Sequence, residues 1–135
     1  AIRAVAFFTG FVSPASAGER ASSDLTRYSA TLFAGDRGAG EITISVVANQ
    51  RVSELGASYI LLEESNDGGR TWSTAKEYEG ESWMTAENRS SYSRTLSYQG
   101  TIGHQYRVTA EVFARDANGI DSRTTPTSSA VTAKR

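Results

Sequence analysis

The clearest hydrophobic pattern along the chain is an alternation of apolar and polar positions from Gln105 to Arg115. Apolar or aromatic side chains fall on every second position: Tyr106, Val108, Ala110, Val112 and Ala114. A period of two is typical of a strand with one face in a core and the other toward water. We therefore predict that this stretch forms a central β-strand.

Shorter stretches with strand character predict further strands at residues 26–34, 41–49, 57–64, 70–78, 91–98 and 120–132, the last interrupted at Pro126. The glycine-rich segment 35–40 predicts a hairpin, and Asn66-Asp67-Gly68-Gly69 predicts a second tight turn. Residues 50–55 are expected to form a crossing loop, and residues 79–89 an irregular segment with a short helical turn. About seven or eight short strands without a long helical pattern predict an all-β fold, a single antiparallel β-sandwich.

The N-terminal segment differs from the rest because Ile2–Phe8 is apolar on both faces of a predicted strand. We expect residues 1–24 to form a strand-forming arm and a flexible connector, and residues 25–135 to form the sandwich. The arm would bury Ile2, Val5, Phe7 and Phe8 against a sheet edge, on its own subunit or on a neighbour. The alternative is a leader remnant, because Arg3, an apolar run and Ala15-Ser16-Ala17 are typical of the end of a signal peptide.

Composition narrows the classes of function. The 135 residues suit one domain, and 14 basic and 15 acidic residues are well mixed, which argues against a nucleic-acid groove. The chain has no cysteine, so disulfides and cysteine metal sites are excluded. No apolar stretch approaches the ~18 residues that a membrane span needs. We expect no cofactor and no metal.

The stretch GTIGHQYRVTAEVFARDANGIDS, residues 100–122, resembles the late strands of fibronectin type III and immunoglobulin-like modules. This resemblance implies that Tyr106 is a tyrosine-corner residue, with a buried ring and a hydroxyl bonded to the backbone. It also implies that Trp72 occupies a position where such modules often bury an aromatic side chain.

Four further pieces, which begin at Arg20, Leu55, Ser91 and Gly119, are similar to an uncharacterised family of small exported proteins of Gram-positive anaerobes. They read RASxxLxxYSA, LGASxI, SYxxxLSYQGxxGxxY and GxDSRT. The resemblance implies a secreted or cell-surface location and an immunoglobulin-like sandwich. It transfers no catalytic residue.

Residues Ser65–Trp72 fit the Asp-box pattern SxDxGxTW of sialidase-like propellers. In that motif the aspartate and serine cap a hairpin turn, a glycine takes positive φ, and the tryptophan packs beneath. A propeller needs several blades, whereas this chain holds one copy. We therefore interpret Asp67, Gly69 and Trp72 as structural residues.

Other candidate chemistry is sparse. His104, the only histidine, falls in a predicted turn, and no serine elbow accompanies it. Trp83 and Tyr92 lie in or near the irregular middle, where exposed aromatics could contact a sugar or a protein. We expect most of the aromatics there to be buried in the core, and Trp83 is the best candidate for a surface role. We expect a non-enzymatic exported structural or interaction module that self-assembles through its arm into a surface structure or filament. A carbohydrate-binding module is the alternative, and a small hydrolase using His104 is less favoured.

Overall fold

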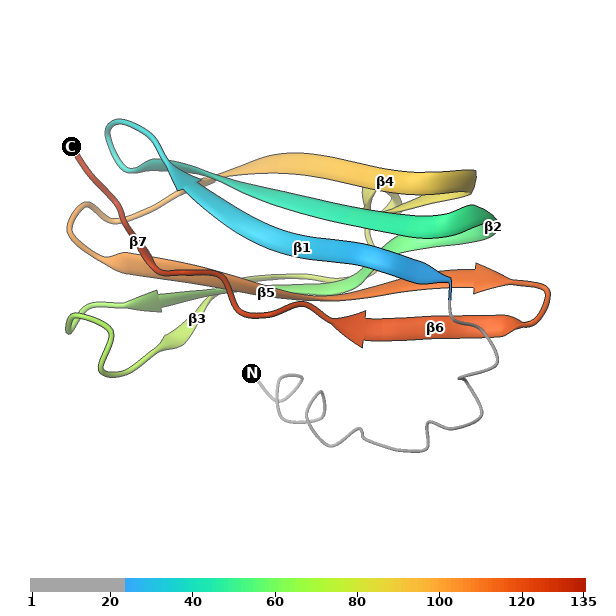
Figure 1. Cartoon of the computed structure of the whole chain (residues 1–135). Coiled ribbons are helices and arrows are strands. Elements are labelled where there is room, and N and C mark those ends of the chain that lie inside the picture. Colours follow the sequence, from blue (N-terminus) through green and yellow to red (C-terminus); the bar gives the residue numbers. More distant parts are fainter. Residues whose placement is uncertain (1–23) are drawn as a thin grey trace.

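The computed structural model describes residues 24–135, and the predicted arm contacts Ile2, Val5, Phe7 and Phe8 lie outside these residues. Strands dominate the described part (Figure 1). In chain order the elements are β1 (Leu25–Ala34), β2 (Ala39–Ser65), β3 (Ser73–Tyr78), the 3-10 helix η2 (Ser82–Met84), β4 (Thr85–Gln99), β5 (Gln105–Asp116), β6 (Gly119–Thr124) and β7 (Val131–Thr132). The predicted central strand, both hairpins and the short helical turn are confirmed.

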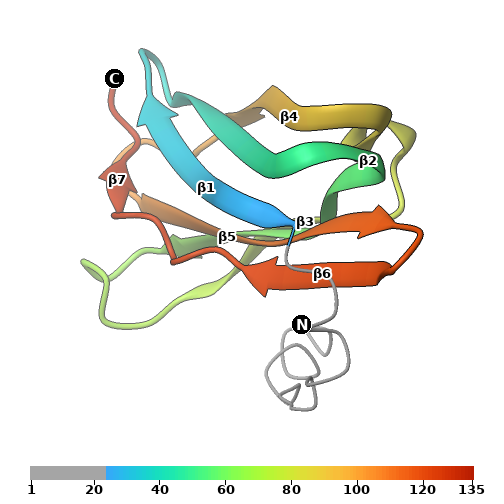
Figure 2. The same cartoon turned by 45° about the vertical axis from the view of Figure 1, so that its right-hand side comes forward.

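All the strands belong to one antiparallel seven-stranded sheet, organised around the 27-residue strand β2. The first part of β2 pairs with β1 and with the second half of β4. Its last part pairs with β3 and β5, and β5 in turn pairs with β6 and β7. The sheet curls so that β1 and β4 lie above β5 and β6 (Figures 1 and 2).

The prediction of a crossing loop at residues 50–55 is wrong, because β2 runs through this segment without interruption. β4 begins at Thr85, earlier than its predicted start at residue 91, and supplies pairing partners for Val52 and Glu54. Val52 is also buried in the core. The polar residues of this segment suggest a loop, but pairing with β4 and the burial of Val52 make it a strand.

A glycine allows β2 to pass closely beside β4. Gly56 has φ +151°, and a Cβ atom at this position would lie 2.1 Å from the carbonyl oxygen of Met84. Only glycine fits both the backbone conformation and the close approach. Beyond this point β2 leaves β4 and continues with β3 and β5, so the sheet folds over at this end.

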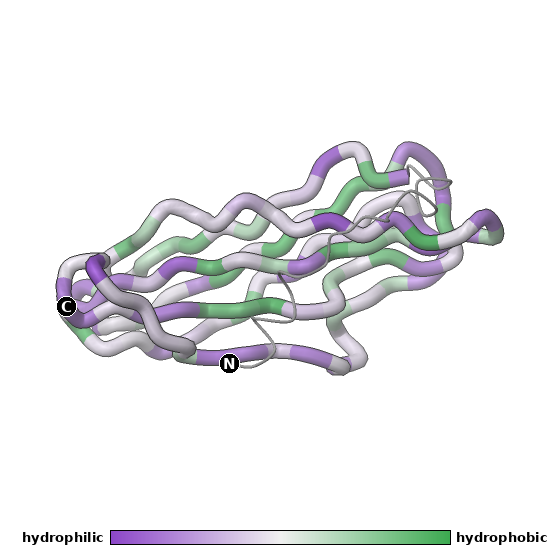
Figure 3. The backbone as a smooth tube through the Cα atoms, turned by 90° about the horizontal axis from the view of Figure 1, so that it is seen from below, coloured by the Kyte–Doolittle hydropathy of each residue, from purple (hydrophilic) through white to green (hydrophobic). Residues whose placement is uncertain are grey.

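The core lies between the two halves of the curled sheet. β2 contributes Ile42, Ile44 and Val46 at alternate positions, and β5 contributes Val108, Ala110 and Val112 in the same way. All six side chains are fully buried, with 0 % of their surface exposed, as the alternation predicted. Hydrophobic positions recur along the strands of both halves (Figure 3).

The two ends of the curled sheet do not pair with each other within the described residues, and this leaves two seams. β1 pairs only with β2, and it faces β6 and the chain that follows β6 (Figure 2). We call this the β1 seam. On the opposite side, β3 and the end of β4 each pair only with β2, and we call the space between them the β3 seam. Unpaired edges are where sheets accept additional chains or ligands.

Candidate functional site

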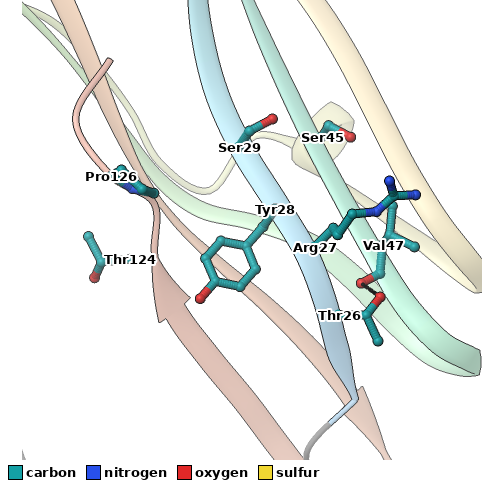
Figure 4. A pocket seen from close by; sticks show the side chains of 8 residues that line it. All are labelled: Thr26, Arg27, Tyr28, Ser29, Ser45, Val47, Thr124 and Pro126. Carbon is teal, nitrogen blue, oxygen red and sulfur yellow. Dashed lines mark hydrogen bonds between the residues drawn. The ribbon is translucent and has the colours of Figure 1, made fainter. Parts of the chain in front are cut away.

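The β1 seam contains a cavity of about 620 Å³. Its lining residues are Thr26, Arg27, Tyr28, Ser29, Ser45, Val47, Thr124 and Pro126. Tyr28 points across the seam toward Thr124 and Pro126, whereas Thr26 bonds back to the carbonyl oxygen of Val47 (Figure 4). The lining therefore extends from the face of the β1–β2 pair, where Ser45 and Val47 lie, to the edge of β1 that faces Thr124 and Pro126.

Hydrogen bonds bridge the β1 seam at both ends. At the start of β1, the Leu25 N–H donates to Oδ2 of Asp121, on β6, over 3.0 Å. Beyond its end, the Gly38 N–H donates to the carbonyl oxygen of Lys134 over 2.7 Å. Between these two bonds, β1 pairs with no described strand other than β2.

The wall opposite β1 is the chain segment that follows β6, and it is held firmly to β5. The Thr125 N–H donates to the Ala110 carbonyl over 2.8 Å, and the Ala110 N–H donates to the Thr125 hydroxyl over 3.0 Å. Ser128 makes the same pair of bonds with Val108, at 2.9 and 3.0 Å. The hydroxyls of Thr125 and Ser128 thus take the place of backbone carbonyl groups as acceptors for β5 along this wall.

Two cavities, one in the β3 seam and one beside it, share one lining residue, Glu64. The smaller, about 210 Å³, is lined by Glu64, Asn66, Thr71, Trp72, Ser73 and His104. The larger, about 420 Å³, lies between β3 and the end of β4 and presents three tyrosines, Tyr78, Tyr98 and Tyr106. We call the two cavities together the Glu64 cleft.

Glu64 is held by two partners from the beginning of β5 and the turn before it. Its Oε2 lies 2.5 Å from His104 Nδ1 and accepts a hydrogen bond from the Tyr106 hydroxyl over 2.9 Å. The antiparallel register sets Glu64 directly opposite Tyr106. Among the described residues, the other carboxylate oxygen, Oε1, accepts no hydrogen bond. Glu64 therefore keeps a fixed orientation and a spare acceptor.

The Tyr106 hydroxyl also accepts a hydrogen bond from the Thr101 N–H over 2.7 Å, and its ring is buried. Burial is the largest cause that raises the pKa of Tyr106, and the hydrogen bond to Glu64 acts in the same direction. The hydroxyl therefore stays protonated as a donor to Glu64. This geometry is that of a tyrosine ring anchored to a nearby turn.

The Asp-box turn forms one wall of the smaller cavity. Asp67 Oδ1 accepts hydrogen bonds from the N–H groups of Arg70 and Thr71, and Oδ2 accepts from the Thr71 hydroxyl over 2.6 Å. The hydrogen bond from the Thr71 hydroxyl is the largest of the causes that lower the pKa of Asp67 to about 2. Gly69 has φ +93° and donates its N–H to the Ser65 hydroxyl. These bonds fix the turn, so the carboxylate of Asp67 is already used within it.

Trp72 lies at the end of this turn, just before β3, and is half-buried. Its indole N–H donates to the Gly69 carbonyl oxygen over 3.1 Å. The Arg107 guanidinium lies 4.2 Å from the ring centroid and bonds to Glu63 over 2.8 Å. The ring is therefore held in a fixed place on the cavity wall.

The hydrolase alternative required His104 beside a serine and a carboxylate in one cleft. The structure places Glu64 on His104 Nδ1 and Ser73 in the lining of the same cavity. Ser73 and His104 make no hydrogen bond with each other in the described part of the chain. The bond that would activate a serine nucleophile is thus missing from the arrangement.

Tyr92, expected as a possible ligand contact, is instead a core residue with 8 % of its surface exposed. Its hydroxyl donates to the Trp83 carbonyl oxygen over 2.6 Å, and burial raises its pKa. Trp83 is half-buried, with Tyr78 edge-on at 5.7 Å and the Arg94 guanidinium 5.2 Å from its ring centroid. The Trp83 ring also packs against the core, so only part of it is open to a ligand.

Sequence reasoning missed Glu64 and the cleft around it. Glu64 is one of several scattered glutamates, and its partners are 40 and 42 positions away along the chain. The available signal was the pairing of its strand with the predicted central strand, which would place it opposite Tyr106.

The fold and these two seams define an all-β protein with two candidate binding surfaces. Comparison of the sequence with models of known protein families and with curated proteins gives no match. Within residues 24–135, no helix is long and apolar enough to cross a membrane. No cluster of three or more potential metal ligands occurs in the same part of the chain.

Proposed function

We propose that this chain is a non-enzymatic exported interaction module of the immunoglobulin-like sandwich type, which self-associates by adding a strand at the β1 seam. The observation that carries the proposal is the outer edge of β1, which pairs with no described strand and borders a cavity of about 620 Å³. Added strands bind through main-chain hydrogen bonds, and pockets for alternate side chains provide specificity.

The proposed occupant is the segment Ile2–Phe8 of a second copy. At ~3.3 Å per residue these seven residues span roughly 23 Å in a strand. The strand β1 has 10 residues and lies between the bridges at Leu25 and Gly38, so the segment matches the open edge in length. Burial of each large side chain of the segment would contribute ~1.5–3 kcal/mol.

The connector is long enough for donation between copies. About 15 residues separate Phe8 from Asp24, and at ~3.3 Å per residue they could reach a neighbouring molecule. If each copy donates its segment to the next without closing a ring, the product is a filament. The exported, cell-surface part of the proposal rests on the sequence resemblance of the pieces that begin at Arg20, Leu55, Ser91 and Gly119.

Self-association is tested with the full chain by light scattering over a range of concentrations and by electron microscopy. Deletion of residues 1–12 should abolish association while leaving the circular dichroism spectrum of the sheet unchanged. A full-length chain that stays monomeric at high concentration would overturn the proposal.

The contact itself can be tested because the chain has no cysteine. Two single-cysteine proteins, Val5→Cys and Ser29→Cys, are mixed under oxidising conditions, with Thr31→Cys as a second acceptor because the register of the added strand is free to vary. Disulfide-linked pairs should form with one of these β1 positions. The control acceptor is Thr74→Cys, which is exposed on β3, and equal cross-linking to it would contradict docking at β1.

A charge on the β1 edge gives a complementary test. Thr31 is exposed, so Thr31→Lys should change the stability by no more than about 0.5 kcal/mol. Lysine on an edge strand opposes the addition of another strand. We expect Thr31→Lys to prevent self-association, while the matched variant Thr74→Lys on β3 leaves it intact.

A further inference from the structure

We propose that the Glu64 cleft binds a neutral carbohydrate of at least two hexose units. This inference is independent of strand addition, because the cleft lies at the β3 seam and shares no lining residue with the cavity at β1. It places a carbohydrate site at Trp72 and Glu64, away from the positions at Trp83 and Tyr92 that the sequence suggested.

The first argument is the pairing of aromatic rings with polar groups. The smaller cavity has one aromatic wall, Trp72, and the larger has Tyr78 and Tyr98. A pyranose ring has an apolar face of C–H groups that packs on an aromatic ring and a rim of hydroxyls that needs hydrogen-bond partners. Asn66, Ser73 and similar neutral side chains supply such partners beside Trp72.

The second argument is the fixed carboxylate at the junction of the cavities. His104 and Tyr106 both bond to Oε2 of Glu64, and Oε1 accepts no hydrogen bond from the described residues. Hydrogen bonds to a charged acceptor are about twice as strong as neutral ones. A sugar hydroxyl would satisfy Oε1, and Glu64 would then contact both sugar units because it lines both cavities.

The third argument is charge. Apart from His104, the charged side chains that line the cleft are Glu64 and Lys76, one of each sign. An anionic or cationic ligand would gain little from such a lining, whereas a neutral polyhydroxylated ligand uses both groups as hydrogen-bond partners. The single carboxylate also favours binding over cleavage, because glycoside hydrolysis generally uses a pair of carboxyl groups.

The size of the site agrees with a disaccharide or longer chain. The larger cavity, about 420 Å³, lies within the roughly 300–1,000 Å³ range of ligand pockets. The smaller one extends the site toward Trp72. The Asp-box turn and the Arg107 contact hold this ring in place before a ligand arrives, which lowers the entropic cost of binding. Because Arg107 covers one face of the ring, the sugar would pack on the other face.

The experiment is a calorimetric titration of the full chain with cellobiose, lactose and N,N′-diacetylchitobiose as probes. We expect saturable binding of at least one probe. Glu64→Gln keeps the shape of the side chain but removes the charge, and it should weaken this binding by about tenfold or more. Asn66→Ala changes an exposed residue of the lining and should weaken it without a loss of fold.

The control is Trp83→Phe, which keeps an aromatic ring beside Tyr78 and should therefore leave the affinity unchanged. It also leaves Trp72 as the only one of the chain's 2 tryptophans, so its fluorescence reports directly on the proposed site. A change of Trp72 emission that saturates at the calorimetric affinity would support the proposal. No saturable binding of any probe at millimolar concentration, or binding that Glu64→Gln leaves intact and Trp83→Phe removes, would overturn it.

Discussion

Replacement of Tyr106 by phenylalanine tests how the Glu64 cleft is held together. The substitution keeps the buried ring and removes only the hydroxyl, which donates to Glu64 over 2.9 Å and accepts from the Thr101 N–H over 2.7 Å. Hydrogen bonds to charged groups contribute about 1.5–3 kcal/mol. The Thr101 N–H adds little to the loss, because Thr101 is exposed and water can replace the lost acceptor.

We therefore expect Tyr106→Phe to lower the free energy of unfolding by about 1.5–3 kcal/mol. Urea unfolding followed by tryptophan fluorescence measures this change. For an m-value of about 1–3 kcal/mol per molar urea, the unfolding midpoint should fall by about 1 M. The slope of the transition should stay the same, because the buried ring is retained.

Tyr98 offers a matched control for the same substitution. Its ring centroid lies 5.4 Å from that of Tyr106, but its hydroxyl makes no hydrogen bond to a described residue. Tyr98→Phe should therefore change stability by no more than about 0.5 kcal/mol. Equal losses in the two variants would refute the assignment of stability to the bonds of Tyr106, and an unchanged Tyr106→Phe would refute the anchoring role altogether.

Three further predictions concern other parts of the sheet. Burial raises the pKa of Tyr98 from 10.0 to about 12, so between these pH values the folded state keeps a proton that the unfolded chain loses. The free energy of unfolding should therefore fall as the pH rises from 10.0 to about 12, and it should fall less steeply in Tyr98→Phe. The pKa of Asp67 is lowered from 3.8 to about 2, so its contribution to the free energy of unfolding should disappear as the pH falls through this window. Chemical denaturation of Asp67→Asn should not show this loss of stability in acid. Gly56→Ala should lower the free energy of unfolding by about 3 kcal/mol, because its Cβ would meet the Met84 carbonyl. Gly68→Ala, where φ is +78° and nothing lies within 4 Å, should cost only about 1–2 kcal/mol and so separates backbone strain from the clash.

Periodicity predicted the strands well where one face is buried and the other is in water. β5 alternates along almost its whole length because its polar positions lie outside the core. The segment from Gln50 to Leu55 has more polar than apolar residues, so its local sequence predicts a loop. It is a strand because β4 reaches back along it and Val52 is buried, and neither fact is visible in local sequence.

The Asp-box turn was recognisable from sequence because all its bonds join residues within a few positions of one another. The Glu64 cleft was not recognisable, because it depends on the register between β2 and β5 and on the way the sheet curls. For the same reason the sequence predicts a surface role for Trp83, although its ring packs against the core and lies edge-on to Tyr78. Hydrogen bonds within a turn can be predicted from the sequence, whereas contacts between strands far apart in the chain cannot.

The open edges of the curled sheet differ in ways that assign the two seams to different kinds of ligand. β3 has only six residues and carries Lys76 and Glu77, and charged residues on a short edge oppose the addition of a strand. β6 is equally short and carries Asp121 and Arg123. β1 has 10 residues, and its stretch from Ser29 to Ala34 has no charge, with Phe33 63 % exposed. These differences favour a polypeptide strand at β1. They favour a different ligand at the β3 seam, one that binds to side chains in the cleft and does not pair with the backbone of a strand.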